Sequence, residues 1–267
     1  MMTTGRLRYL AYLSEDPDRM ADFYTRHLAL EELGRSNSGD ISLTDGSFNI
    51  TFLKARDDLD EMDKTIGLHH IGLEVDDMDK VITKYLDRTP RGEVIEEQGG
   101  LHFGEVRIFD PECHAISLSE SNFGIGREET RIPRMAHIAL NALDPTNILD
   151  FYVDMFNFRE LDTSRERRQQ GRKNRFAADG FTNFAIHPYY NITLEGHEER
   201  FGMNHIGFLV SDMDEKLANF KKEIPVAPRP DSRPYAEHRI RDLEANGVDL
   251  SMAKGWEVDL GKWENGV

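Results

Sequence analysis

The sequence predicts an α+β protein built from four copies of one βαβββ unit. A short apolar motif, in which Gly or Ala stands two positions after a lead residue, recurs at intervals of 61, 67 and 68 residues. Each copy runs through an acidic turn into a segment with the apolar spacing of an amphipathic helix, and short β-prone runs follow. Repetition of this length is typical of repeated supersecondary units. The lead residues are Tyr9, His70, His137 and His205.

The first half of the chain holds two units. In the first, Asp16 can cap a helix and Pro17 suits its first turn. The expected elements of unit one are a strand at Leu7–Leu13, a helix at Pro17–Ala29 and strands at Glu31–Ser36, Asp40–Thr44 and Asn49–Leu53. Those of unit two are a strand at Leu68–Val75, a helix at Met78–Arg88 and strands at Glu93–Glu97, Phe103–Phe109 and Ala115–Ser119.

The second half holds units three and four, after a polar connector at Glu120–Arg134. We therefore expect domains at residues 1–125 and 131–255, followed by a tail at 256–267 that carries both tryptophans and resembles a packing or lid segment. Unit three is expected to have a strand from Met135, a helix from Asp144-Pro145 and strands at Phe158–Thr163, Arg175–Asp179 and Asn183–His187. Unit four is expected to have a strand from Met203, a helix at Met213–Lys222 and strands at Tyr235–Asp242 and Gly247–Met252.

Composition limits the function classes. The 267 residues include 39% hydrophobic ones and carry a net charge of −16, which fits a globular protein and disfavours nucleic acid as a partner. No apolar run reaches the length of a membrane span, and no signal peptide is recognised, so we expect a cytoplasmic protein without membrane contact. The single Cys113 excludes an internal disulfide, while homo-oligomerisation stays open. The tract Ser164–Arg175 is strongly basic: it could receive an anionic ligand or be a solvated loop.

The candidate site follows from strand alternation, since side chains at every second position share a face. In the last strand of unit four, Asp249 is placed on the same face as His205, and the lead residue of unit three is His137. Two imidazoles, a carboxylate and open positions are typical of non-haem Fe(II) sites and also suit Mn²⁺ or Zn²⁺. The alternative is that these histidines are satisfied core residues. The first half offers Tyr9, Thr51, His70 and Ser117 at the same places, so we expect no metal there.

Alternation also suggests residues that contact the substrate. Tyr235, Glu237 and Arg239 fall on one face of the strand beside Asp249. We expect Tyr235 and Glu237 to be catalytic, with the tyrosine as a proton donor, and Arg239 to bind an anionic substrate. The alternative is a ladder of surface ion pairs on an exposed strand.

Taken together, the four units, the H-x-[AG] strands at His70, His137 and His205, and the ending DLEANGVDLS (Asp242–Ser251) resemble the vicinal oxygen chelate superfamily. This group includes glyoxalase I, bleomycin resistance proteins and type I extradiol dioxygenases. The resemblance covers nearly the whole chain. It implies that paired units form two cupped mixed β-sheets, with a metal inside the cup.

The arrangement of four units looks most like the two-domain extradiol dioxygenases. Their His, His and Glu ligands would match His137, His205 and Asp249, with Asp in place of Glu. The fourth ligand of glyoxalases would fall on Ala185 and is therefore absent. The acid/base histidine that the dioxygenases carry on the last strand of unit three would fall near Thr182, so it does not map cleanly onto this chain.

The resemblance implies a divalent-metal enzyme whose small substrate chelates the metal through vicinal oxygens. We expect an extradiol-dioxygenase-like oxidoreductase with Fe(II), while Mn(II) or Zn(II) would also suit the ligands. Two alternatives stay open at this point: a lyase or isomerase of the glyoxalase or epimerase type, and a metal-free protein that binds a small molecule, as the resistance proteins do.

Overall fold

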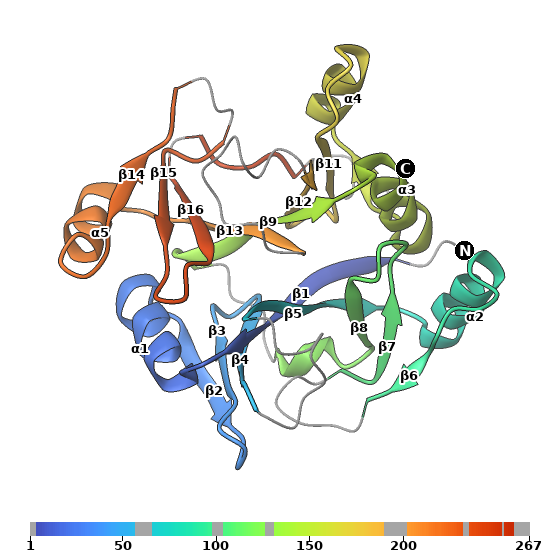
Figure 1. Cartoon of the computed structure of the whole chain (residues 1–267), viewed down its shortest axis with the longest axis horizontal. Helices are drawn as coiled ribbons and strands as arrows, with labels where there is room; N and C mark the ends of the chain where they lie inside the picture. Colours follow the sequence, from blue (N-terminus) through green and yellow to red (C-terminus); the bar gives the residue numbers. More distant parts are fainter. Residues whose placement is uncertain are drawn as a thin grey trace.

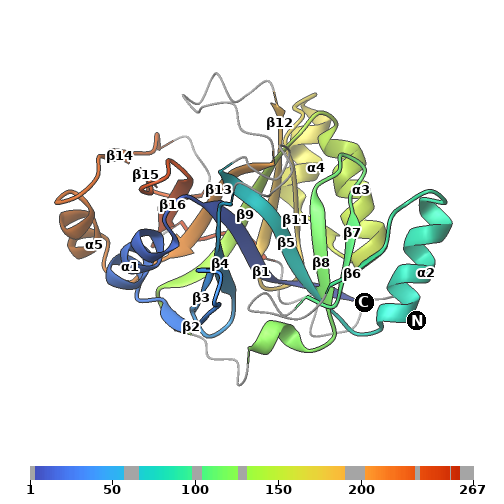
Figure 2. The same ribbon diagram turned by 60° about the horizontal axis from the view of Figure 1, so that its bottom comes forward.

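Two eight-stranded mixed sheets, each flanked by helices, make up the described part of the chain (Figures 1 and 2). The computed structural model describes residues 4–56, 66–97, 104–125, 131–189, 202–231, 235–252 and 254–258. The first sheet has the order β2-β3-β4-β1-β5-β8-β7-β6, and the second has the order β10-β11-β12-β9-β13-β16-β15-β14. Units one and two thus form one sheet, and units three and four form the other.

In both sheets the lead strands of the paired units lie at the centre. They run antiparallel to each other, and the last strand of each unit pairs in parallel with its own lead strand. The first sheet contains β1 (Gly5–Ser14), β2 (Glu31–Arg35), β3 (Ile41–Thr44), β4 (Asn49–Lys54), β5 (Gly67–Val75), β6 (Ile95–Glu96), β7 (Val106–Phe109) and β8 (Ala115–Ser119). The second contains β9 (Arg134–Ala142), β10 (Arg159–Glu160), β11 (Arg175–Ala178), β12 (Asn183–Pro188), β13 (Met203–Leu209), β14 (Val226–Pro228), β15 (His238–Arg241) and β16 (Gly247–Ser251).

The acidic turn after each lead strand begins a helix, as the sequence predicted. In each case an aspartate side chain accepts backbone N–H groups of the first turn, which stabilises a helix by about 1 kcal/mol. The helices are α1 (Pro17–Leu28), α2 (Met78–Arg88), α3 (Pro145–Phe156) and α5 (Met213–Phe220). Helix α1 contacts α5 and α2 contacts α3, so helices of one half lie against those of the other (Figure 1).

The basic tract is not simply a loop. Helix α4 (Asp162–Gln169) occupies its first part, and the strand expected at Phe158–Thr163 shrinks to β10. Arg, Glu and Gln favour helix, and Arg165 forms an ion pair with Asp162 three residues earlier. Other expected strands are shorter than predicted, and β14 was not predicted. Part of the expected Phe103–Phe109 strand lies outside the described residues.

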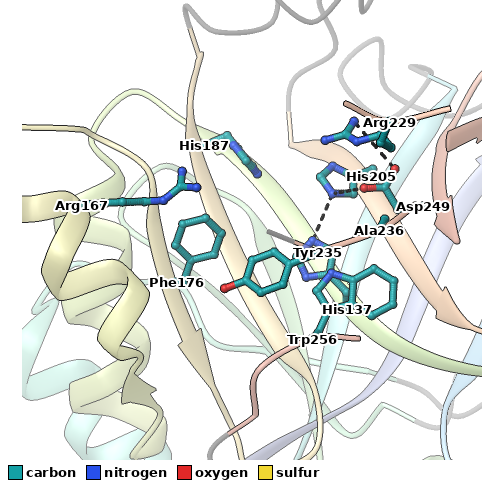
Figure 3. A pocket seen from close by; sticks show the side chains of 10 residues that line it. All are labelled: His137, Arg167, Phe176, His187, His205, Arg229, Tyr235, Ala236, Asp249 and Trp256. Carbon is teal, nitrogen blue, oxygen red and sulfur yellow. Dashed lines mark hydrogen bonds and ion pairs between the residues drawn. The ribbon is translucent and has the colours of Figure 1, made fainter. Parts of the chain in front are cut away.

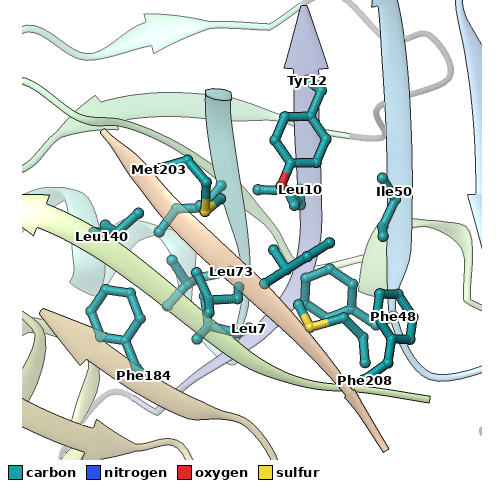
Figure 4. Close-up of a cluster of buried hydrophobic side chains, with 14 of the residues drawn as sticks. Leu7, Leu10, Tyr12, Phe48, Ile50, Leu73, Leu140, Phe184, Met203 and Phe208 are labelled. Carbon is teal, nitrogen blue, oxygen red and sulfur yellow. The ribbon is translucent and has the colours of Figure 1, made fainter. Parts of the chain in front are cut away.

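One hydrophobic core joins the two sheets. Side chains from both halves meet between them, including Leu10, Leu73, Leu140 and Phe208 (Figure 4). Because this core covers one face of each sheet, the lead residues on the opposite face point away from it. No helix in the described part of the chain is long and apolar enough to cross a membrane.

Buried hydrogen bonds reinforce the join between the halves. Asp45 accepts the backbone N–H of Met135, and Asp179 accepts that of Leu7, so each half binds the lead strand of the other. Both aspartates are buried. These bonds fix how one sheet lies against the other.

Candidate metal centre

The three predicted metal ligands come together in the second half, on the sheet face that points away from the core (Figure 3). In the antiparallel β9–β13 pair His137 lies opposite Gly207, and in the parallel β13–β16 pair Gly207 lies beside Asp249. This register places His137 Nε2 3.1 Å from His205 Nε2. Asp249 Oδ2 lies 3.3 Å from the same His205 nitrogen. All three side chains are buried.

Asn183 fixes the tautomer of His137. Its side-chain nitrogen donates to the backbone carbonyl of Glu257 at 2.7 Å, so its carbonyl oxygen must face His137 Nδ1, 2.8 Å away. That oxygen can only accept, and Nδ1 of the imidazole must therefore carry the proton. The Nε2 atom of neutral His137 is left with its lone pair facing the other two groups.

A longer chain of amides fixes His205 in the same way. The Asn141 side-chain nitrogen donates to the carbonyl of Met203, and the Asn141 side-chain oxygen then accepts from Asn204 at 2.8 Å. The remaining Asn204 oxygen faces His205 Nδ1 at 2.6 Å. His205 Nδ1 is therefore the protonated nitrogen, and its Nε2 also presents a lone pair.

Burial keeps both imidazoles neutral at pH 7. Loss of solvent lowers the pKa of His137 to about 4, although the nearby Asp249 carboxylate opposes this shift. Burial, aided by the positive charge of Arg239, lowers the pKa of His205 well below its usual value. Two neutral nitrogens and a carboxylate oxygen thus converge with no proton between them, and such an array of acceptors suits a cation.

Asp249 already has a cationic partner. Arg239 donates to its two oxygens at 2.5 and 3.0 Å, and Arg229 lies 3.9 Å away. The ion pair with Arg239 holds the Asp249 carboxylate toward β15. As the side chains stand, no group of three or more His, Cys, Asp and Glu residues in the described part of the chain could hold a metal ion. The donor types and their tautomers fit a divalent metal, but the Asp249 carboxylate must turn toward the histidines to complete the set.

Most of the chain matches one known protein family. The model of the Glyoxalase/Bleomycin resistance protein/Dioxygenase superfamily matches residues 6–118 and 134–251. The chain belongs to this superfamily. A search of curated protein sequences found no match.

Solved structures of a glyoxalase and of two dioxygenases share this fold. A Mn(II)-bound glyoxalase from Novosphingobium aromaticivorans superposes with a TM-score of 0.72 at 17% identity, covering 98% of this chain and 86% of that one. The 2,3-dioxygenase LapB from Pseudomonas sp. KL28 has a TM-score of 0.67 at 16% identity, with 95% and 92% covered. The 2,2',3-trihydroxybiphenyl 1,2-dioxygenase from Sphingomonas wittichii strain RW1 has a TM-score of 0.64 at 12% identity, with 97% and 94% covered. These likenesses confirm the predicted fold.

The structure places the three residues expected beside Asp249, namely Tyr235, Glu237 and Arg239, in different surroundings. Tyr235 lines the pocket, and burial raises the pKa of its hydroxyl group. Arg239 points to the same side but is bound to Asp249. Glu237 does not line the pocket. Its carboxylate accepts the backbone N–H groups of Met252 and Lys254 instead.

Glu237 turns away from the pocket because of the backbone conformation before β15. Strand β15 begins only at His238, so side-chain alternation does not extend back to Glu237, and Ala236 lines the pocket in its place. The equivalent residue of the first half, Glu105, binds the backbone N–H groups of Glu120 and Ser121 in the same manner. Glu237 is thus a residue that holds the turn after the last strand.

Several residues of the pocket were missed by sequence reasoning. The space among the lining side chains amounts to about 390 Å³ when the solvent-open part is included. Its further lining residues are Arg167, Phe176, His187, Arg229 and Trp256. They come from α4, from two strands of unit three, from the end of β14 and from the tail, so only the fold brings them together. Two signals in the sequence pointed toward them: the basic tract contains Arg167, and the tail expected to be a packing or lid segment contains Trp256.

Trp256 explains the glycine that stands two positions after His205. Its ring stacks on His137 with centroids 5.2 Å apart and an interplanar angle of 10°. A Cβ atom at Gly207 would lie 2.5 Å from the indole. The first half repeats this packing, because a Cβ atom at Gly72 would lie 2.7 Å from Phe123. An aromatic side chain from the segment after the last strand occupies the space that the small residue leaves.

The first-half cup holds a different set. Tyr9 takes the place of His137 and stacks between His70 and Phe123. Ser117 lies opposite Arg107, which forms an ion pair with Glu97. Thr51 donates to Ser42, and His70 Nδ1 faces His69 Nδ1 at 2.7 Å. Hydroxyl groups and a single lead histidine make this cup a poor metal site.

Proposed function

We propose that the chain is a divalent-metal-dependent enzyme whose substrate chelates the metal through two neighbouring oxygens. The finer form of this proposal is an extradiol-dioxygenase-like oxidoreductase with Fe(II). The observation that carries it is the convergence of His137 Nε2, His205 Nε2 and Asp249 Oδ2, with both histidine tautomers fixed by asparagines. Three protein ligands would leave positions open for substrate, as catalytic sites require.

Each pocket residue has a role in this proposal. His137, His205 and Asp249 would hold the metal, which supplies Lewis acidity and, as Fe(II), a means of handling oxygen. Asn183 and Asn204 keep the imidazole lone pairs aimed at it. Trp256 covers His137 and limits water access. Tyr235, on the pocket wall, would donate or accept a proton at a substrate oxygen.

The matched dioxygenases support the oxidoreductase form, and the Mn(II)-bound glyoxalase keeps a lyase or isomerase as an alternative. Ala185 disfavours a mechanism that needs a fourth protein ligand, because it lies buried in the cup where that ligand would stand. A metal-free binding protein is a second candidate. One observation favours it, namely that Arg239 already neutralises Asp249.

The test begins with metal content. The chain is purified without added metal, as wild type, His205→Ala and His70→Ala, and its bound metals are measured by mass spectrometry. We expect near-stoichiometric metal in the wild type and in His70→Ala, which changes the equivalent residue of the first cup, and loss of metal in His205→Ala. Anaerobic reconstitution with Fe(II), followed by catechols and oxygen, should then give coloured ring-cleavage products.

Two results would redirect the proposal. If His205→Ala and Asp249→Ala retain the metal content of the wild type, the centre does not hold the metal and the metal-free binding protein becomes the better account. If metal binds at the centre but no catechol is cleaved, the lyase or isomerase form replaces the dioxygenase.

A further inference from the structure

We propose that the substrate carries an anionic group, that Arg167 binds this group at the end of the pocket away from the metal centre, and that His187 assists from its place between the two ends. This inference rests on the proposed function, because it assigns the chemical class of the molecule that would chelate the metal. The substrate would be a planar aromatic molecule with two vicinal oxygens and a short substituent ending in a carboxylate or a similar anion.

The pocket has two chemically different ends. Figure 3 shows His137, His205 and Asp249 at one end, and Arg167 beside Phe176 at the other, with His187 between Arg167 and His205. Arg229 belongs to the metal end, since it lies 3.9 Å from Asp249. A ligand that fills the pocket therefore contacts carboxylate and imidazole at one end and a guanidinium group at the other.

Aromatic rings line the space between the two ends. The centroid of Phe176 lies 5.8 Å from that of Tyr235 and 6.2 Å from that of His187. Tyr235 in turn lies 6.4 Å from His137. Such walls pack against a planar apolar ring by offset or edge contacts. One aromatic ring spanning this region would bring its substituents to both ends.

Helix α4 supplies the cation. Arg165 and Arg168 are exposed and form ion pairs with Asp162 and Glu160. Arg167 is half-buried and turns to the pocket, where its guanidinium carbon lies 4.9 Å from the centroid of Phe176. A ring under one face of a guanidinium leaves the N–H groups at its edge able to bind an anion. In a protein of net charge −16, such a wall is the local attraction that an anionic ligand needs.

His187 adds a second donor. The Asn174 side-chain nitrogen lies 2.6 Å from His187 Nδ1, and when it donates there the ring proton of neutral His187 is on Nε2. The ring lies 5.7 Å from that of His205, so His187 stands between the two ends. Its N–H group can donate to the same anion as Arg167.

The experiment compares two catechols of matched length, 4-propylcatechol and 3-(3,4-dihydroxyphenyl)propanoate. Dissociation constants are measured anaerobically with the Fe(II)-loaded protein by optical titration. We expect the wild type to bind the carboxylate compound about 10 to 100 times more tightly, since a charge-assisted hydrogen bond is worth that much. Arg167→Gln should remove most of this preference and leave the affinity for 4-propylcatechol nearly unchanged.

The matched control is Arg165→Gln, which removes an arginine of the same helix that does not line the pocket, and it should keep the preference. Equal binding of the two catechols by the wild type, or an unchanged preference in Arg167→Gln, would overturn the inference and leave the metal function standing. If neither catechol binds to the metal-loaded protein, vicinal-oxygen chelation itself fails, which is a different outcome.

Discussion

The two cups of this protein share a scaffold and differ in a few side chains at equivalent positions. The register of the strands defines the equivalence, since Arg107 lies opposite Ser117 just as Arg239 lies opposite Asp249. The equivalent pairs, first half then second, are Tyr9 and His137, Asn49 and Asn183, Glu97 and Arg229, Arg107 and Arg239, Ser117 and Asp249, and Phe123 and Trp256.

Both cups pair an arginine with a carboxylate, but the carboxylate comes from different places. In the first cup Arg107 binds Glu97, which follows β6. In the second cup Arg239 binds Asp249, on the neighbouring strand β16. Moving the acid from the edge to the last strand places it beside His205. Two differences therefore distinguish the candidate metal centre from the first cup. The carboxylate is Asp249 on the last strand and not Glu97 at the edge, and the lead residue is His137 and not Tyr9.

The cups also share an asparagine that holds the covering segment. Asn49 donates to the carbonyl of Phe123 at 2.8 Å, and Asn183 donates to the carbonyl of Glu257 at 2.7 Å. Only Asn183 has a lead histidine to bind with its oxygen. A contact that is structural in the first half thus gains a second task in the other.

The two cups should differ most in how much the free energy of unfolding depends on their arginines, Arg107 and Arg239. Arg239→Gln removes both close hydrogen bonds to the buried Asp249 carboxylate and leaves only Arg229, 3.9 Å away, so the free energy of unfolding should fall by about 3–5 kcal/mol. Added Mn(II) should recover part of this loss, because a cation then replaces the guanidinium. Urea unfolding with and without Mn(II) measures both effects.

The comparison variant is Arg107→Gln, whose side chain is 22% exposed against 10% for Arg239. Arg107→Gln should lower the free energy of unfolding by less than Arg239→Gln does, and Mn(II) should not restore any of this loss. An equal response of the two variants to Mn(II) would remove the distinction between the cups.

A second difference concerns the aspartate that begins the last turn of each half. Asp110 pairs with His114 at 2.7 Å, whereas Asp242 binds the neutral Asn246 and the hydroxyl of Tyr24 from the first half. Burial raises the pKa of Asp242 from 3.8 to about 6. Because the folded state holds this proton more tightly, the stability contributed by Asp242 is complete below pH 4 and is lost as the pH rises to 6. The loss is about 3 kcal/mol at most.

Unfolding free energies between pH 4 and 7 test this. Asp242→Asn should flatten the decline over that range. Tyr24→Phe should shift the decline to higher pH, since the tyrosine hydrogen bond favours the ionised carboxylate. A decline that persists unchanged in Asp242→Asn must come from another group.

The smallest expected effect is on metal affinity through the asparagines. Asn183→Ala should weaken metal binding about 10- to 100-fold, because the His137 tautomer is no longer fixed. Asn49→Ala, the equivalent change in the first cup, should leave affinity unaltered. Competition with a chelator gives both constants.

Asn183→Asp separates the two tasks of this residue. It keeps an acceptor for His137 Nδ1 but removes the donor to Glu257, so it should retain more metal affinity than Asn183→Ala. If both variants bind metal as the wild type does, Asn183 serves only the tail.

Local sequence pattern was enough to predict the repeat, most of its helices and strands, and the three candidate ligands, but not α4 or β14. Strand alternation and helix capping act over a few residues, so the lead residues, the acidic caps and the position of Asp249 could be predicted from local pattern. The shared core of the two halves, in contrast, depends on contacts far apart in the chain.

The partners of His137, His205 and Asp249 depend on contacts between segments that are far apart in the chain. Arg239 binding to Asp249, the amide chain behind His205 and Trp256 stacking on His137 all join residues whose spacing carries no local signal. Glu237 shows the limit of the local rule, because alternation holds only within a strand and β15 begins one residue later. Arg167 shows the reverse, since a basic tract acquires a pocket-facing residue only when α4 packs beside β11. Side-chain pattern fixes which face a residue takes, while packing between distant segments fixes its partners.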